Sequence, residues 1–451
     1  MGKSFRLFIA LLTLTLLTLT LSINISNVKA QGSPTKSVLI VVNDAASNKF
    51  GRYLGEILIA EGLNSFDLNT VNAINISILS QYQVIVLAET PLTPTQASTF
   101  ITYVNNGGYL IAMRPDSQIA SLFDLGASQG TQSDGYLKMN GMGPSQGLST
   151  VTLQIHGTVD RYTLSGASTL AQLYSNATTS TVYPAVAQSA NSHGTAFLYD
   201  LAKSIVYTRQ GNPANANVDV DGDGVLRSID LFYNSNGTTW VDRDKIPVPQ
   251  ADEQQRFFAR LVQQAINNYQ PMPQLWYFPG VNKTILIITG DAHANPPSSF
   301  QSEINSLNSH NAKATFYLSM GGGITDSNIQ TWRSQGHEFG IHPPFYKPDT
   351  YPPYNITNLN QGFDVYLSWY DMAFSTIPSR TVRNHQVAWS GWTDAADIAV
   401  SHGFAMDANF YHWGPWLQKP DGSWAHGYIT GSGQPMKFMR ADGTILPYYQ
   451  Q

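Results

Sequence analysis

Four short stretches in the second half of this 451-residue chain place an acid or an imidazole at the end of an apolar run. They read ILIITGDAH, GHEFGIH, RTVRNH and FAMDANF. The runs belong to a pattern of alternating strands and helices, and the carboxyl ends of parallel strands meet on one side of such a fold. Asp and His bind divalent metals, and a carboxylate beside a bound metal can accept a proton. The four stretches therefore predict a metal site with a base nearby.

The elements that would position these side chains can be read from hydrophobic periodicity. Apolar or β-branched runs predict strands, and helices are expected from Ser298, through Trp332 to Gly336, and from Thr393. The predicted strands cover residues 283–291, 314–319, 337–342, 380–385 and 404–410. In this register Asp291, His342, His385 and Asp407 all stand at carboxyl ends of strands and are expected on one rim.

At these residues the chain resembles the polysaccharide deacetylases of the NodB-homology type, carbohydrate esterases built on a distorted (β/α) barrel. The resemblance covers about residues 281–451 and rests on TGDAH, GHEFGIH and VRNHQ. It implies such a barrel, shortened at its carboxyl end, that removes acetyl groups from N-acetylated glycans with zinc or a similar transition metal. Asp291 would be the general base, Arg383 would keep it ionised and oriented, and His342 would be the first imidazole ligand.

The chain departs from the family pattern at two metal positions. Ala292 stands where the family has a ligating Asp, and Tyr346 stands where it has a second His. Neighbouring imidazoles could replace them, so the expected ligand set is His293, His342 and His385. The residues expected to line a substrate groove are Trp389, Trp392 and Asp407.

Two other activities stay open at this point. The family's last motif, which carries a general-acid His, has no visible counterpart, so the barrel could instead be a catalytically degenerate glycan-binding surface protein. A glycosidase would need two carboxylates, and only Asp291 and Asp407 are placed for that role.

The amino-terminal half shows a second strand–helix alternation. Strands are expected at 37–44, FDLN, QVIVLA and YLIAMRP, with one helix closing at Gly62 and another opened by Thr93. The pattern predicts a doubly wound parallel sheet and resembles the glutamine-amidotransferase-like (flavodoxin-like) fold over about residues 37–125. That activity needs a thiolate, and the chain contains no Cys, so the module is expected to bind a ligand without catalysis.

An acidic loop, DVDGDGVLRSID, lies in a β-rich extension expected at residues 130–250. Its carboxylates have the spacing of a calcium loop, with a glycine at the sixth position where the backbone turns sharply. The candidate ligands are Asp219, Asp221, Asp223 and Asp230. The same residues could form an Asp/Gly-rich surface turn, so structural calcium is one of two readings.

Length and composition set the frame for these sites. Two domains are expected, an amidotransferase-like one at 37–270 and the barrel at 281–451, joined by a Pro-rich linker at 271–280. Lys3 and Arg6 before an apolar run predict a signal peptide at 1–30, and no second segment is apolar enough to span a membrane, so a secreted or cell-surface protein is expected. A net charge of −5 with scattered cations argues against nucleic-acid binding. The expected partner is a polysaccharide or cell-wall glycan.

Overall fold

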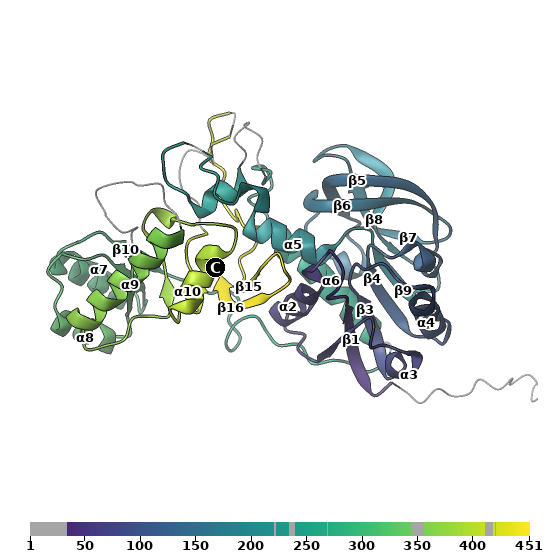
Figure 1. Cartoon of the computed structure of the whole chain (residues 1–451), viewed down its shortest axis with the longest axis horizontal. Coiled ribbons are helices and arrows are strands. Elements are labelled where there is room, and N and C mark those ends of the chain that lie inside the picture. Colours follow the sequence, from purple (N-terminus) through teal and green to yellow (C-terminus); the bar gives the residue numbers. More distant parts are fainter. Residues whose placement is uncertain are drawn as a thin grey trace, which may run out of the picture.

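The computed structural model describes residues 34–220, 222–233, 240–267, 269–343, 356–410, 418–419 and 421–451. The fold is mixed α/β, with one large sheet in the amino-terminal half and two smaller sheets in the carboxy-terminal half (Figure 1). The predicted signal peptide lies outside the described residues. None of the helices in the described part of the chain has the length and apolar character to cross a bilayer.

The large sheet has nine strands in the order β2-β1-β3-β4-β9-β8-β7-β5-β6. β1, β2, β3, β4 and β9 are parallel, and antiparallel pairs join β9 to β8, β8 to β7, and β5 to β7 and β6. The strands are β1 (Lys36–Val42), β2 (Phe66–Thr70), β3 (Tyr82–Leu87), β4 (Tyr109–Met113), β5 (Leu125–Met139), β6 (Leu153–Leu164), β7 (Ser168–Tyr174), β8 (Ser180–Gln188) and β9 (Gly194–Phe197). The parallel sheet predicted for this half is confirmed, and it continues into an antiparallel extension.

Helices pack against this sheet where the sequence offers caps and apolar faces. They are α2 (Tyr53–Ala60), α3 (Ile76–Leu79), α4 (Pro94–Asn105), α5 (Leu201–Gln210) and α6 (Gln250–Asn267). The helix predicted after Thr93 is α4, which begins with a reciprocal capping box between Thr93 and Gln96. Its buried face, which includes Phe100 and Tyr103, covers the strands.

The β-rich reading of residues 130–250 is wrong beyond β9. The stretch LAKSIVYTRQ forms α5, and the Asp200 side chain caps it by accepting a hydrogen bond from the backbone N–H of Lys203. Its β-branched residues Ile205 and Val206 suggested a strand, but both are fully buried on the helix. The Asp200 N-cap and the burial of this segment have outweighed the weak preference of its β-branched residues for a strand.

The carboxy-terminal half contains two small sheets. One is parallel and has the order β10-β11-β12; the other has the order β13-β14-β16-β15. The strands are β10 (Thr289–Ala292), β11 (Thr315–Leu318), β12 (Glu338–Ile341), β13 (Thr381–Val382), β14 (Met406–Asp407), β15 (Met436–Met439) and β16 (Ile445–Gln450). The helices are α7 (Pro297–Ser309), α8 (Asp326–Ser334), α9 (Ile356–Ala373) and α10 (Asp394–Ser401).

The two small sheets meet at β12 and β13. The N–H of Ser379, just before β13, donates to the carbonyl of Phe339 in β12 at 2.7 Å. Across the described residues these strands form two open sheets, so the closed barrel stays a prediction. The strand predicted at 283–291 is also shorter than expected, because pairing begins only at Thr289 and the preceding Leu286 is largely exposed.

The hairpin of β15 and β16 joins the two halves by packing against α2 and α5 (Figure 1). Gln210 and Met439 exchange two hydrogen bonds of 3.0 and 2.8 Å, and the Gln450 side chain donates to the carbonyl of Arg209 at 2.6 Å. Tyr53 donates to the carbonyl of Lys437 at 2.8 Å. The junction is therefore buried and polar, and these four hydrogen bonds pair donors and acceptors across the two halves.

The segment predicted as a linker also packs on the first half, at the end of α2. Leu275 donates its N–H to the carbonyl of Gly62 at 2.9 Å, and Tyr277 donates its hydroxyl to Oε2 of Glu61 at 2.6 Å. Glu61 is fully buried, and this burial raises its pKa from the usual 4.5 to about 7.

The Glu61→Gln substitution is expected to flatten part of the pH dependence of stability. Because the pKa of Glu61 is raised in the folded state, the folded wild-type chain binds more protons than the unfolded chain between about pH 4.5 and 7. Its contribution to the free energy of unfolding is present below this window and is lost as the pH rises through 7, by roughly 3 kcal/mol. Urea unfolding at pH 5 and pH 8 measures the difference. An equal loss of stability in wild type and Glu61→Gln would contradict the expectation.

Candidate metal centre

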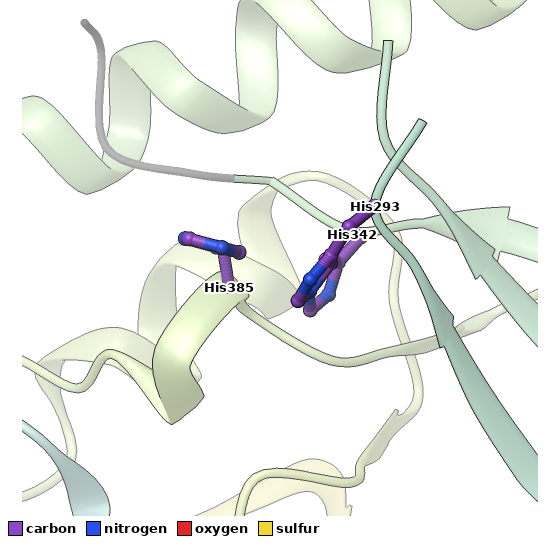
Figure 2. A group of neighbouring side chains, drawn as sticks. All are labelled: His293, His342 and His385. Atoms are coloured by element: carbon purple, nitrogen blue, oxygen red, sulfur yellow. The ribbon is translucent and has the colours of Figure 1, made fainter. Parts of the chain in front are cut away.

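Three histidines from separate segments converge at the carboxyl ends of the first small sheet (Figure 2). One ring nitrogen from each of His293, His342 and His385 lies within 4.8 Å of the corresponding nitrogens of the other two. The rings of His293 and His342 are stacked with centroids 5.2 Å apart, and their Nε2 atoms are 3.1 Å apart. The ring of His385 stands edge-on to both, at 5.0 and 5.3 Å.

The strand register explains why these side chains meet. His293 comes directly after β10, two residues beyond Asp291, and alternate residues of a strand share a face. Ala292, between them, is buried on the opposite side. His342 comes directly after β12, and the N–H of His385 donates to the carbonyl of Pro343 at 3.0 Å, which ties the end of β13 to the end of β12.

A backbone hydrogen bond sets the proton on His342. Its Nδ1 lies 2.8 Å from the carbonyl oxygen of Arg383, which can only accept, so Nδ1 carries the hydrogen. In the neutral ring the lone pair is then on Nε2, the atom that faces His293. A hydrogen bond from one ring nitrogen to a backbone carbonyl orients an imidazole so that its other nitrogen can bind a metal.

Burial favours the neutral, ligating form of these rings. Burial lowers the pKa of His342 to about 4. The carboxylate of Asp291 raises this pKa, whereas His385 and His293 lower it further. The pKa of His385 is lowered as well, first by burial and then by His293. Metals bind neutral imidazole, so both rings are ready to ligate at neutral pH.

The donor set fits a zinc-like ion. Zinc–nitrogen bonds are about 2.0–2.1 Å long, which places two imidazole nitrogens of one tetrahedral site about 3.3 Å apart. The 3.1 Å between His293 and His342 is close to this separation, and His385 is only partly buried, so its ring can approach by side-chain rotation. Three imidazoles with room for a further ligand are typical of catalytic zinc.

Asp291 is held beside this cluster by Arg383. The guanidinium donates from Nη1 to Oδ1 of Asp291 at 3.2 Å, from Nη2 to the hydroxyl of Thr289 at 2.9 Å, and from Nε to the carbonyl of Ala408 at 2.9 Å. It also lies over the ring of Tyr317, 5.6 Å from the centroid. Arg383 thus bridges from β13 to β10 and fixes the carboxylate, whose side chain keeps 25% of its surface exposed.

Strained backbone flanks two of the histidines. Ala294, after His293, has a φ of 56°, and Gln386 and Val387, after His385, have φ values of 57° and 52°. Left-handed conformations at residues other than glycine cost on the order of 1–3 kcal/mol and cluster at functional sites.

Two residues predicted to line a substrate groove lie in the core instead. Trp389 and Trp392 are 3% and 6% exposed. Trp389 packs on Phe410 and Phe438, and the indole N–H of Trp392 donates to the carbonyl of Gly211 at 3.2 Å. The groove assignment of both is corrected, because Trp389 packs inside the second half and Trp392 packs against the first half.

Asp407 stands at the end of β14 as predicted but is fully buried. Its carboxylate accepts two hydrogen bonds from Asn409, from the backbone N–H at 2.9 Å and the side-chain amide at 2.6 Å, and burial raises its pKa to about 7. It lines an open pocket of about 330 Å³ together with Thr289 and Arg383. A carboxyl with a raised pKa suits the general acid of a glycosidase, so the paired-carboxylate alternative stays a prediction.

The calcium reading of the acidic loop stays a prediction, because Asp221 lies outside the described residues. Asp219 accepts hydrogen bonds from the N–H groups of Gly222 and Gly224, and the guanidinium of Arg227 donates twice to Asp223, at 2.9 and 2.7 Å. Asp230 accepts from the N–H of Arg227 at 2.7 Å. Tyr346, the other altered family position, also lies outside the described part of the chain.

Several supporting residues escaped the sequence reasoning. Thr289 and Tyr317 contact the guanidinium of Arg383. Asn409 donates to Asp407, and its Oδ1 accepts a hydrogen bond from the N–H of Asn384 at 2.7 Å. Thr289 precedes Asp291 by two residues and shares its face, so the strand alternation carried that signal. The roles of Tyr317 and Asn409 depend on contacts distant in sequence.

No family model and no curated protein matches this chain. Solved structures with some similarity include a protein described as a polysaccharide deacetylase involved in O-antigen biosynthesis from Bordetella bronchiseptica, with 15% identity, a TM-score of 0.23 and coverage of 37% of this chain and 55% of that one. A glutamine amidotransferase from Thermotoga maritima has 9% identity, a TM-score of 0.31 and coverage of 51% and 98%.

An α-L-fucosidase from Paenibacillus thiaminolyticus has 14% identity and a TM-score of 0.30, and the match covers 37% of this chain and 29% of the fucosidase. A β-galactosidase from Bacillus circulans sp. alkalophilus is similar at 10% identity and a TM-score of 0.31, again over less than a third of its own length. At these TM-scores the likenesses decide neither the fold nor the activity.

Proposed function

We propose that this chain is an exported, metal-dependent hydrolase that removes acetyl groups from N-acetylated glycans. The observation that carries the proposal is the cluster of His293, His342 and His385 beside the carboxylate of Asp291, which Arg383 holds in place. The choice of a glycan rests on the resemblance of TGDAH, GHEFGIH and VRNHQ to motifs of the polysaccharide deacetylases. Export rests on the predicted signal peptide.

His293, His342 and His385 would hold the metal through their ring nitrogens. A divalent ion such as Zn²⁺ supplies two kinds of chemistry when bound: it lowers the pKa of a water ligand and polarises a carbonyl oxygen. The carbonyl of Arg383 fixes the tautomer and direction of His342, so that its Nε2 lone pair stays available.

Asp291 would act as the general base. Its Oδ1 accepts from Arg383, and its Oδ2 accepts no hydrogen bond from a described residue, so Oδ2 is the atom available to take a proton from water. The water oxygen then forms a bond to the acetyl carbon, and the carbon–nitrogen bond breaks. The leaving amine needs one proton, which the protonated Asp291 can return, and the products are acetate and a free amino sugar.

Acetate release is the direct test. The metal-loaded protein is incubated with N-acetylated chitooligosaccharides and with peptidoglycan fragments, before and after treatment with a chelator. The proposal expects release that stops on chelation and returns with zinc. A protein that binds zinc stoichiometrically and releases no acetate from either glycan would contradict the deacetylase assignment.

A catalytically degenerate, glycan-binding protein is the second candidate. The observation that favours it is Ala292, which is buried and offers no ligand atom where the family has a metal-binding Asp. Elemental analysis separates the two candidates. About one tightly bound zinc per chain supports the hydrolase, whereas glycan binding without any bound metal supports the degenerate form.

A further inference from the structure

A second groove lies in another part of the molecule, between α6, the segment 271–280 and the loop 427–434. Its volume is about 640 Å³, within the usual range of small-ligand sites. None of the three clustered histidines, nor Asp291 or Arg383, lines it. The aromatic side chains in its wall are Trp276, Tyr277, Phe278 and Tyr428.

The segment that carries three of these rings is fixed to α2. Leu275 pairs with the carbonyl of Gly62, and the Gln274 side chain donates to the carbonyl of Glu61 at 2.7 Å. Gly62 has a φ of +78°, and a Cβ there would lie 2.2 Å from the carbonyl oxygen of Leu275, so only glycine permits this approach. The rings therefore have a rigid support.

Two rings present apolar surface to solvent. The indole N–H of Trp276 donates to the carbonyl of Asn282 at 2.7 Å, which fixes the ring, yet 57% of the residue stays exposed. Tyr428 is 39% exposed on the opposite segment, where its backbone N–H donates to the carbonyl of Ile246 at 2.7 Å. Fixed and exposed aromatic rings are costly in water unless a ligand covers them.

The floor of the groove is polar. Arg256, Arg260 and Gln263 recur at helical spacing along α6 and present guanidinium and amide groups on one face. Arg256 lies over the ring of Tyr277 at 5.6 Å, and Tyr277 donates to Glu61. The other oxygen of Glu61, Oε1, is buried and has no hydrogen-bond partner among the described groups.

We propose that this groove binds a glycan chain at a site separate from the metal centre. Sugar rings combine apolar C–H faces, which pack on flat aromatic rings, with hydroxyl groups that both donate and accept hydrogen bonds. Trp276 and Tyr428 supply the faces, and Arg256, Arg260 and Gln263 supply the polar partners. Arg256 donates to Glu253, and Arg260 donates to the carbonyls of Pro144 and Gln146. A guanidinium has five N–H donors, so each group has further donors for a sugar hydroxyl.

The inference rests on the proposed function only for the choice of probe. Isothermal titration of the full chain with N-acetylated chitohexaose measures binding, and the His342→Ala variant removes the metal chemistry without touching the groove. Binding is expected to survive in His342→Ala. It is expected to weaken at least tenfold in Trp276→Ala and to recover in Trp276→Phe, which keeps an aromatic face. Trp424→Ala is the matched control, since Trp424 is also exposed, at 50%, and does not line the groove.

Each outcome decides the point. Equal affinities of wild type and Trp276→Ala would overturn the proposal, and so would the absence of any binding of the hexasaccharide by a wild-type chain with a normal melting temperature. Binding of a proline-rich peptide, lost in Trp276→Ala while the hexasaccharide does not bind, would assign the groove to peptides and also overturn it. Acetate release without glycan binding at Trp276 would leave the proposed function standing and remove this inference. Glycan binding without acetate release would leave this inference standing and remove the proposed function.

Discussion

The His342→Ala variant is expected to lose bound zinc, from about one equivalent per chain to less than about a tenth after dialysis. His342 is the buried member of the cluster, and its Nε2 is directed by the hydrogen bond from Nδ1 to the carbonyl of Arg383. Loss of an orienting partner alone costs about 10–100-fold in metal affinity, so loss of the ligand itself should cost at least as much. Elemental analysis by mass spectrometry measures the metal, and acetate release should fall with it.

The matched control is His310→Ala. His310 is exposed at the end of α7, bonds only to its own helix and lies outside the cluster. It should keep wild-type zinc and wild-type melting temperature. Retention of a full equivalent of zinc in a folded His342→Ala chain would show that the ion is bound elsewhere and would remove the three-histidine site.

The Asp291→Asn variant is expected to keep its zinc and lose 10²- to 10⁴-fold in kcat for acetate release. An amide is nearly isosteric with the carboxylate but cannot accept a proton from water, which is the share of catalysis that a general base supplies. Arg383 can still donate to the side-chain oxygen, so the packing around Thr289 and Tyr317 should survive. Steady-state kinetics and metal content, measured on the same samples, test both halves of the expectation.

Asp421→Asn serves as the control for a surface carboxylate, because Asp421 is exposed and bonds only locally to Ser423. Equal rates of acetate release by wild type and Asp291→Asn would exclude Asp291 as the base. A variant that loses zinc together with activity would instead make Asp291 part of the metal site.

The sequence was sufficient where local pattern and topology agree. Asp291 and His293 could be placed on one face because alternate residues of a strand point the same way, and His342 could be placed beside them because parallel strands share an edge. The strands and capped helices of the amino-terminal half followed from β-branched runs and from Thr93. These features depend on neighbours a few residues away.

The sequence failed where distant contacts decide. Residues 201–210 form α5 in spite of their β-branched content, since Asp200 caps a helix that packs against α2, α6 and β6. Trp389 and Trp392 were expected to line a substrate groove, but nothing in the local sequence shows that the rings of Phe438 and Tyr207 would cover them. The left-handed backbone at Gln386, directly after His385, has no propensity signal either.

The junction formed by β15 and β16 has a consequence for modularity. Gln210 pairs with Met439 across the junction, and Gln450 pairs with the carbonyl of Arg209. Separating the halves near residue 275 would therefore leave several buried amides and carbonyls without partners. Calorimetry of the intact chain should therefore show one cooperative transition in place of two. The two halves are therefore expected to be inherited together. Recombination of the second half with another domain would require that domain to offer a surface equivalent to α5.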